Sequence, residues 1–168
     1  ARVVVCSPGR NFVTLLIETE DGLVGAGDGT LNGRELAVAA YPEYHPEQRY
    51  ARRDLQHFAD KVAAGATSAI TQFFFNPDAY FHFVDEVRAL GVDVPIVPGI
   101  MPIHNYARIA QFAARDGIEI PRWVALKMEG FMDDAASIRA FGLDVVTRLC
   151  ERLLDGGAPG LHFYTLNQ

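Results

Sequence analysis

The stretch AITQFFFNPDAYFHFVDEV, residues 69–87, predicts a buried strand that leads directly into a helix. Ala69–Phe75 is almost continuously apolar, which is typical of a parallel strand that is covered on both faces. Asn76 and Pro77 follow as a helix N-cap and a first-turn proline, and Gly91 marks the end of the predicted helix. Strands joined by helices in this way build the right-handed units of a parallel sheet.

From residue 36 onward the chain continues to alternate between strands and helices. Further strands are predicted at Leu36–Tyr41, Pro95–Ile100 and Gly160–Leu166. Further helices are predicted at Glu47–Ala64, Asn105–Arg115 and Asp133–Asp155. Four strands make about half of a (β/α)8 barrel, which usually needs on the order of 250 residues. The predicted fold is therefore α/β, an incomplete (β/α)8 barrel with two open sheet edges.

Residues 1–35 have a different pattern, which predicts a short antiparallel β-meander ahead of the barrel. Its strands are expected at Arg2–Cys6, Phe12–Glu20 and Leu23–Gly27, with Asp21-Gly22 as a type I′ hairpin turn. The glycines of GAGDG follow a hairpin strand instead of opening a helix after a parallel strand. We therefore interpret them as packing or bulge positions and not as a phosphate loop.

Composition limits the classes of function. A net charge of −6 argues against nucleic acid as a partner, and no apolar run is long enough to cross a membrane. Cys6 and Cys150 show no metal-binding or disulfide spacing, so we expect buried structural thiols and a cytoplasmic location.

Residues 33–47 (GRELAVAAYPEYHPE) fit two local structures. With the residues before it, the segment Gly33–Tyr41 reads as the first turns of a helix. With the residues after it, Leu36–Tyr41 reads as a short buried strand that ends in a loop containing Pro42 and Pro46. The sequence pattern alone does not decide between the helix and the strand.

The segment SPGRNFVTLLIETEDGLVGAGDGTLNGRELAVAAY, within residues 1–41, resembles the N-terminal capping segment of D-mannonate dehydratases of the enolase superfamily. The resemblance implies that Asn32 contacts an acid sugar and that a separate barrel would hold Mg²⁺. By residue type alone, Asn32 fits a helix N-cap or a turn equally well.

The motifs AAYPEYHPE, AITQFFFNPDAYFHFVDEV, IVPGIMPI and LHFYTLN are similar to the C-terminal part of 5,10-methylenetetrahydrofolate reductase, over about residues 37–168. That resemblance implies reduction of 5,10-methylenetetrahydrofolate to 5-methyltetrahydrofolate by NAD(P)H through FAD. The two resemblances predict a chimera, with a cap-like segment at 1–35, a junction at 36–42 and half of a reductase barrel at 42–168.

Several polar side chains suit a flavin nucleotide. Asp54, His57 and Lys61 follow i, i+3, i+7 spacing and share one flank of a predicted helix. The carboxylate could accept from ribose hydroxyls and the ammonium could meet a phosphate, although a solvated face with mild charge pairing has the same pattern. The resemblance implies that these three residues, with Tyr41 and His45, bind FAD. His57 stands where the reductases are expected to have asparagine.

Gln72 is a polar side chain inside an otherwise apolar strand, where an unpaired amide would cost stability. Either a ligand or a neighbouring strand or loop could satisfy it. The resemblance implies that Gln72 bonds the pterin of the folate and that Phe112 lies near folate and flavin, although the spacing of Phe112 also fits core packing. Arg108 and Gln168 replace an expected glutamine and arginine, and both changes predict weaker folate binding.

No catalytic residue is assigned, because the resemblance places the required acid and carboxylate on early barrel strands that this sequence lacks. We therefore expect weak flavin binding and little turnover. One alternative is an acid-sugar dehydratase fragment that uses Mg²⁺. The other is a non-catalytic half-barrel that self-associates through its open sheet edges.

Overall fold

The computed structural model describes residues 2–6, 12–18, 24–28, 37–47 and 50–165. Three strands near the N-terminus form an antiparallel sheet in the order β1 (Arg2–Cys6), β2 (Phe12–Glu18) and β3 (Val24–Asp28). This sheet shares no strand with the second sheet of the molecule.

The second sheet is parallel and has the strand order β4 (Ala37–Ala40), β5 (Ser68–Phe73), β6 (Ile96–Ile100) and β7 (His162–Phe163). Its helices are α1 (Ala51–Ala63), α2 (Pro77–Ala89), α3 (Tyr106–Asp116), α4 (Arg122–Gly130) and α5 (Ala135–Asp155). Helix α1 joins β4 to β5 and α2 joins β5 to β6, while α3, α4 and α5 all lie between β6 and β7. The predicted parallel α/β fold is confirmed, and it is consistent with a partial (β/α)8 barrel.

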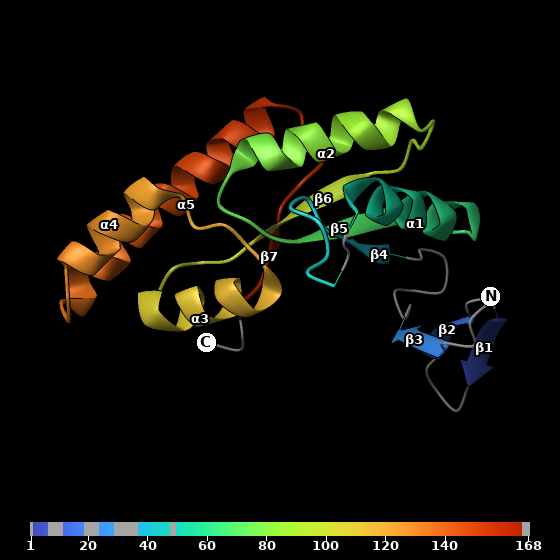
Figure 1. Ribbon diagram of the computed structural model, residues 1–168, viewed down its shortest axis with the longest axis horizontal. Coiled ribbons are helices and arrows are strands. Elements are labelled where there is room, and N and C mark those ends of the chain that lie inside the picture. Colours follow the sequence, from blue (N-terminus) through green and yellow to red (C-terminus); the bar gives the residue numbers. More distant parts are fainter. Residues whose placement is uncertain (1, 7–11, 19–23, 29–36, 48–49, 166–168) are drawn as a thin grey trace.

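Helices cover one face of this parallel sheet. Figure 1 shows α2 and α5 running beside each other along the strands, and α2 contacts both α1 and α5. The register places Val38, Ala69 and Ile96 side by side on β4, β5 and β6, and the last two are buried. Apolar residues at every second strand position therefore pack against the helices.

The opposite face of the sheet is more open. Ala39, Ile70 and Val97 lie side by side on this face, and each is exposed or half buried. Gln72 follows Ile70 two residues later on the same strand. In a closed barrel this face points inward. Within the part of the chain that the structure describes, no strand pairs with the outer edges of β4 and β7. Self-association through these edges stays a prediction.

The core is centred on the junction between β5 and α2. Phe74 is fully buried and its ring stacks on that of Tyr80, with ring centroids 5.8 Å apart. The Tyr80 hydroxyl donates to the Ile96 carbonyl at 2.8 Å, so the ring also ties α2 to β6. The predicted N-cap is confirmed, because the Asn76 side chain accepts from the Asp78 N–H. This junction fixes the direction in which the chain leaves the sheet.

Several predicted boundaries were wrong. Helix α1 begins at Ala51 instead of Glu47, after a Tyr50 N-cap that makes no side-chain cap bond. Strand β5 ends at Phe73, because Asn76 and Pro77 already begin the next helix. Strand β7 has only two residues.

Helix α4 was missed entirely. It is short and follows Pro121, and it exposes Trp123 and Leu126, so its sequence lacks a clean apolar stripe. Cys150 is half buried instead of fully buried, and burial raises the pKa of its thiol.

Candidate functional site

The carboxyl ends of the parallel strands bring most of the predicted site residues to one edge of the sheet. Tyr41 directly follows β4, Gln72 lies near the end of β5, and Tyr164 directly follows β7. In (β/α)8 barrels and open α/β sheets, this edge carries the ligand site.

One group of site residues joins the loop after β4 to helix α1. The His45 N–H donates to Asp54 Oδ2 at 2.9 Å, and the rings of Tyr41 and His45 meet edge to face with centroids 4.6 Å apart. Lys61 Nζ donates to the Ala39 carbonyl at 3.1 Å. Tyr41, His45, Asp54 and Lys61 therefore lie together, and their binding of a nucleotide stays a prediction. His57 lies on the same helix and is exposed.

The charges in this first group influence one another. Burial lowers the pKa of Lys61, and the Asp54 carboxylate partly opposes that shift. Burial raises the pKa of Tyr41, and Asp54 and Asp116 raise it further. An anion placed beside Lys61 would favour the charged form of its ammonium group. A pyrophosphate is such an anion and requires a positive charge beside it.

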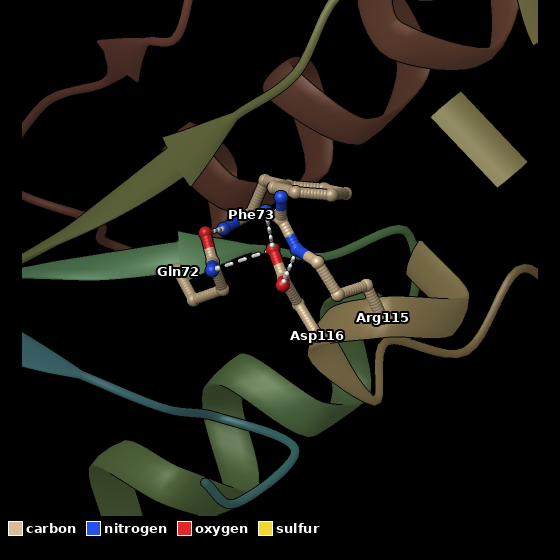
Figure 2. A network of polar contacts seen from close by, with 4 residues as sticks. All are labelled: Gln72, Phe73, Arg115 and Asp116. Atoms are coloured by element: carbon tan, nitrogen blue, oxygen red, sulfur yellow. Dashed lines mark hydrogen bonds and ion pairs between the residues drawn. The ribbon is translucent and has the colours of Figure 1, made fainter. Parts of the chain in front are cut away.

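A second group links the end of β5 to helix α3, as Figure 2 shows. Gln72 Nε2 donates to Asp116 Oδ2 at 3.4 Å, and Gln72 Oε1 accepts from the Phe73 N–H at 3.1 Å. Arg115 donates twice to Asp116, at 2.6 Å through Nε and at 2.9 Å through the guanidinium terminus. Asp116 on helix α3 and the backbone of Phe73 on the same strand thus supply partners for Gln72, whereas the alternative to a ligand predicted from the sequence was a neighbouring strand or loop.

Phe112 is half buried and packs against the core, yet two cations flank its ring. The guanidinium carbons of Arg108 and Arg115 lie 5.5 Å and 5.3 Å from the ring centroid. Both are within the range of cation–π contacts. Arg115 therefore connects Phe112 to Asp116, and through Asp116 to Gln72.

The two groups meet at a small hollow. Its lining includes Tyr41 from the first group and Gln72 and Asp116 from the second, and its volume of about 10 Å³ has room for no more than a water molecule, so it marks where the two groups adjoin. Of the predicted site residues, Tyr41 and Gln72 line this hollow. Asn32 lies outside the described residues, so its predicted contact with an acid sugar is untested.

Tyr164 belongs to this edge and was not selected from the sequence. Its hydroxyl donates to the Thr71 carbonyl at 2.9 Å. Gly99 allows this approach, because a Cβ at that position would lie 2.7 Å from Tyr164 Cε2 and closer still to the Thr71 carbonyl oxygen. A larger residue at position 99 would force Tyr164 or Thr71 to move.

Glu43 joins the loop after β4 to the segment before α4. Its Oε2 accepts from the Glu119 N–H at 3.2 Å. Burial raises the pKa of Glu43 to about 7; the Glu119 N–H acts against this shift and the Glu119 carboxylate adds to it. This carboxyl therefore titrates near neutral pH at the rim of the candidate site.

Glu43 makes stability depend on pH. Because its pKa in the folded protein is raised from 4.5 to about 7, its favourable contribution is complete below pH 4.5 and is lost as the pH rises through about 7. Solvent screening reduces the effect to roughly 1–2 kcal/mol. Glu43→Gln is expected to be more stable than wild type by that amount at pH 8 and about equal at pH 4.5. Urea unfolding at both pH values measures this difference.

Glu151→Gln, a change at an exposed carboxylate on α5, is the matched control and should follow wild type at both pH values. If Glu43→Gln shows the same pH dependence as wild type, the proposed titration of Glu43 is wrong.

The fold and the site geometry together define the class of protein: a parallel α/β chain, consistent with a partial (β/α)8 barrel, whose candidate ligand site lies at the carboxyl edge of the strands. The methylenetetrahydrofolate reductase family matches residues 32–168, and the chain belongs to this family.

Individual relatives agree with this assignment. The chain is 41% identical over 134 residues to 5,10-methylenetetrahydrofolate reductase of Escherichia coli, a match that covers 80% of this chain and 45% of the relative. It is 38% identical over 135 residues to methylenetetrahydrofolate reductase 2 of Saccharomyces cerevisiae, covering 79% of this chain and 22% of that protein. The chain therefore spans about half the length of its bacterial relatives, or less.

A solved structure shares the fold. It is an uncharacterized protein from Clostridium thermocellum, described as binding two copies of 5-methyl-5,6,7,8-tetrahydrofolic acid. It aligns with a TM-score of 0.53 and 23% identity, covering 77% of this chain and 46% of that protein.

These comparisons give no support to the predicted dehydratase segment, to a chimeric origin or to Mg²⁺. The family match begins at residue 32, ahead of the predicted junction at 36–42. Among the described residues, no group of three or more His, Cys, Asp and Glu is placed to hold a metal ion. A search of the same residues finds no helix with the length and apolar character to span a membrane.

Proposed function

We propose that this chain supplies the FAD- and folate-facing part of a methylenetetrahydrofolate reductase barrel. The single observation that carries the proposal is that the hollow at the carboxyl edge is lined by residues from both predicted sites, Tyr41 on the flavin side and Gln72 on the folate side. We also propose that the reductase part begins ahead of β4, because the family match starts at residue 32.

The residues of the first group fit the adenosine and pyrophosphate portions of FAD. The Lys61 ammonium uses one of its donors on the Ala39 carbonyl, so it retains others for a phosphate oxygen. The Asp54 carboxylate accepts from the His45 N–H and retains acceptor capacity for ribose hydroxyls. Tyr41 and His45 present ring surfaces beside this position.

The residues of the second group fit a reduced folate. Gln72 supplies an amide on the open face of the sheet, and Phe112 supplies an aromatic ring whose neighbouring guanidinium groups suit a carboxylate-bearing ligand. The Clostridium thermocellum protein that shares the fold is described as binding 5-methyltetrahydrofolic acid, which supports a folate ligand here.

The reaction proposed for the complete barrel is the reduction of 5,10-methylenetetrahydrofolate by NAD(P)H. FAD, when bound, would carry the hydride from the nicotinamide to the folate. In that reaction Lys61 and Asp54 would hold the cofactor, and Gln72 and Phe112 would bind the folate ring. No described residue is assigned as the general acid, so turnover requires parts of the relatives that this chain does not span.

A flavin fluorescence titration tests the cofactor half of this proposal. Saturable quenching of FAD by the wild-type chain is expected. Lys61→Ala should raise the Kd at least about tenfold, because a charge-assisted hydrogen bond contributes about 1.5–3 kcal/mol. Circular dichroism checks that the variant stays folded after losing its bond to the Ala39 carbonyl.

Lys127→Ala is the matched control, because Lys127 lies on α4 over the Phe131 ring, outside the first group. It should bind FAD as wild type does. Absence of saturable quenching by wild type, or an equal Kd in Lys61→Ala, would contradict the proposed flavin site.

A further inference from the structure

Two neighbours fix the direction of the Gln72 amide. The Phe73 N–H can only donate, so it selects the Gln72 oxygen as its partner. An ionised Asp116 carboxylate can only accept, so it selects the Gln72 nitrogen. Both contacts demand the same orientation of the amide, and turning it over would break both of them (Figure 2).

Asp116 is held ionised in this position. The hydrogen bonds from Arg115 keep the pKa of Asp116 below its ordinary value. The Asp116 side chain is only 19% exposed, whereas that of Arg115 is 70% exposed. Asp116 is also the last residue of α3, where the helix dipole disfavours a carboxylate. The helix dipole therefore does not favour an acid at position 116. The contact of Asp116 with Gln72 is an interaction that an acid does favour.

The fixed amide leaves a defined pattern for a ligand. Gln72 Nε2 retains one hydrogen and Oε1 retains one lone pair. A ring edge with an acceptor next to a donor matches this pair, and the 4-oxo and N3–H groups of a pterin form such an edge. A 4-amino ring presents the reverse order, a donor next to an acceptor.

We propose that Asp116, supported by Arg115, is a positioning residue that fixes the Gln72 amide and so makes the site select 4-oxo over 4-amino pterins. The inference rests on the proposed folate function. Asn at position 116 can donate or accept, so only the Phe73 N–H would then hold the Gln72 amide in its orientation, and the preference for one ring would weaken. The selectivity therefore comes from a residue that need not touch the ligand.

The test compares folic acid with its 4-amino analogue, which differs at that one position of the ring. Binding of each to the full chain is measured by calorimetry at pH 8. Wild type is expected to bind folic acid at least about tenfold more tightly, since the reversed ring edge mismatches two donor–acceptor pairs, each costing about 1–3 kcal/mol. In Asp116→Asn the preference for folic acid should fall by at least about threefold, because only the Phe73 N–H still holds the Gln72 amide.

Two further variants complete the design. Asp144→Asn breaks another exposed Asp–Arg pair, with Arg148 at 3.0 Å on α5, and should keep the wild-type ratio. Arg115→Gln should lower the ratio of the affinity for folic acid to that for the 4-amino analogue, because Asp116 loses its hydrogen bonds from Arg115. This variant is the test if thermal melting shows that Asp116→Asn is unfolded.

The outcomes separate the two claims. If wild type binds neither pterin, the proposed folate function fails and this inference fails with it. If wild type binds folic acid selectively and the folded variants at positions 115 and 116 keep the same ratio, the inference alone is overturned.

Discussion

Phe74→Ala is expected to lower the free energy of unfolding by about 3–5 kcal/mol, the usual cost of removing a fully buried phenylalanine. The side chain has no exposed surface, and its ring stacks on Tyr80, which in turn bonds the Ile96 carbonyl. The cavity would open where β5, α2 and β6 meet. Since domains are commonly stable by only about 5–15 kcal/mol, much of the variant population should be unfolded in mild denaturant.

Urea unfolding followed by the fluorescence of Trp123, the single tryptophan, measures this loss. Leu143→Ala is the matched control, because its side chain on α5 is 69% exposed and its removal should change stability by less than about 0.5 kcal/mol. A Phe74→Ala protein within 1 kcal/mol of wild type would show that β5 and α2 are not the centre of the core.

The architecture was largely predictable from the sequence. Apolar runs marked β5 and β6, and local signals such as the Asn76 cap and Gly91 marked helix ends. These signals act between residues that are near in sequence, so pattern reasoning finds them. Residues 33–47 fitted both helix and strand, and only pairing with β5 shows that Ala37–Ala40 is a strand.

The site was predictable only in part. Asp54, His57 and Lys61 share one helix flank, so their spacing alone grouped them. Asp116, Tyr164 and Glu43 were missed because their partners lie 44, 93 and 76 residues away in the chain. One local signal was available for Asp116, namely an acid at a helix C-terminus, where the dipole disfavours it.

We propose that this chain is one part of a reductase barrel whose catalysis needs the rest. The described residues form a sheet of four parallel strands, and the chain spans about half the length of its bacterial relatives. It holds candidate binding residues for FAD and folate and no assigned acid. Loss of a general acid alone costs about 10²–10⁴-fold in rate, and incomplete positioning of the cofactor costs more.

The most direct measurement is NAD(P)H oxidation by a fused polypeptide in which the N-terminal half of the Escherichia coli relative precedes residues 37–168. The chain alone is expected to show no detectable oxidation above free FAD. The fused polypeptide should exceed both the chain and the isolated N-terminal half by at least about 100-fold. A fused polypeptide that folds and binds FAD, yet oxidises NAD(P)H no faster than either half, would contradict the assignment of this chain as a functional half of the reductase barrel.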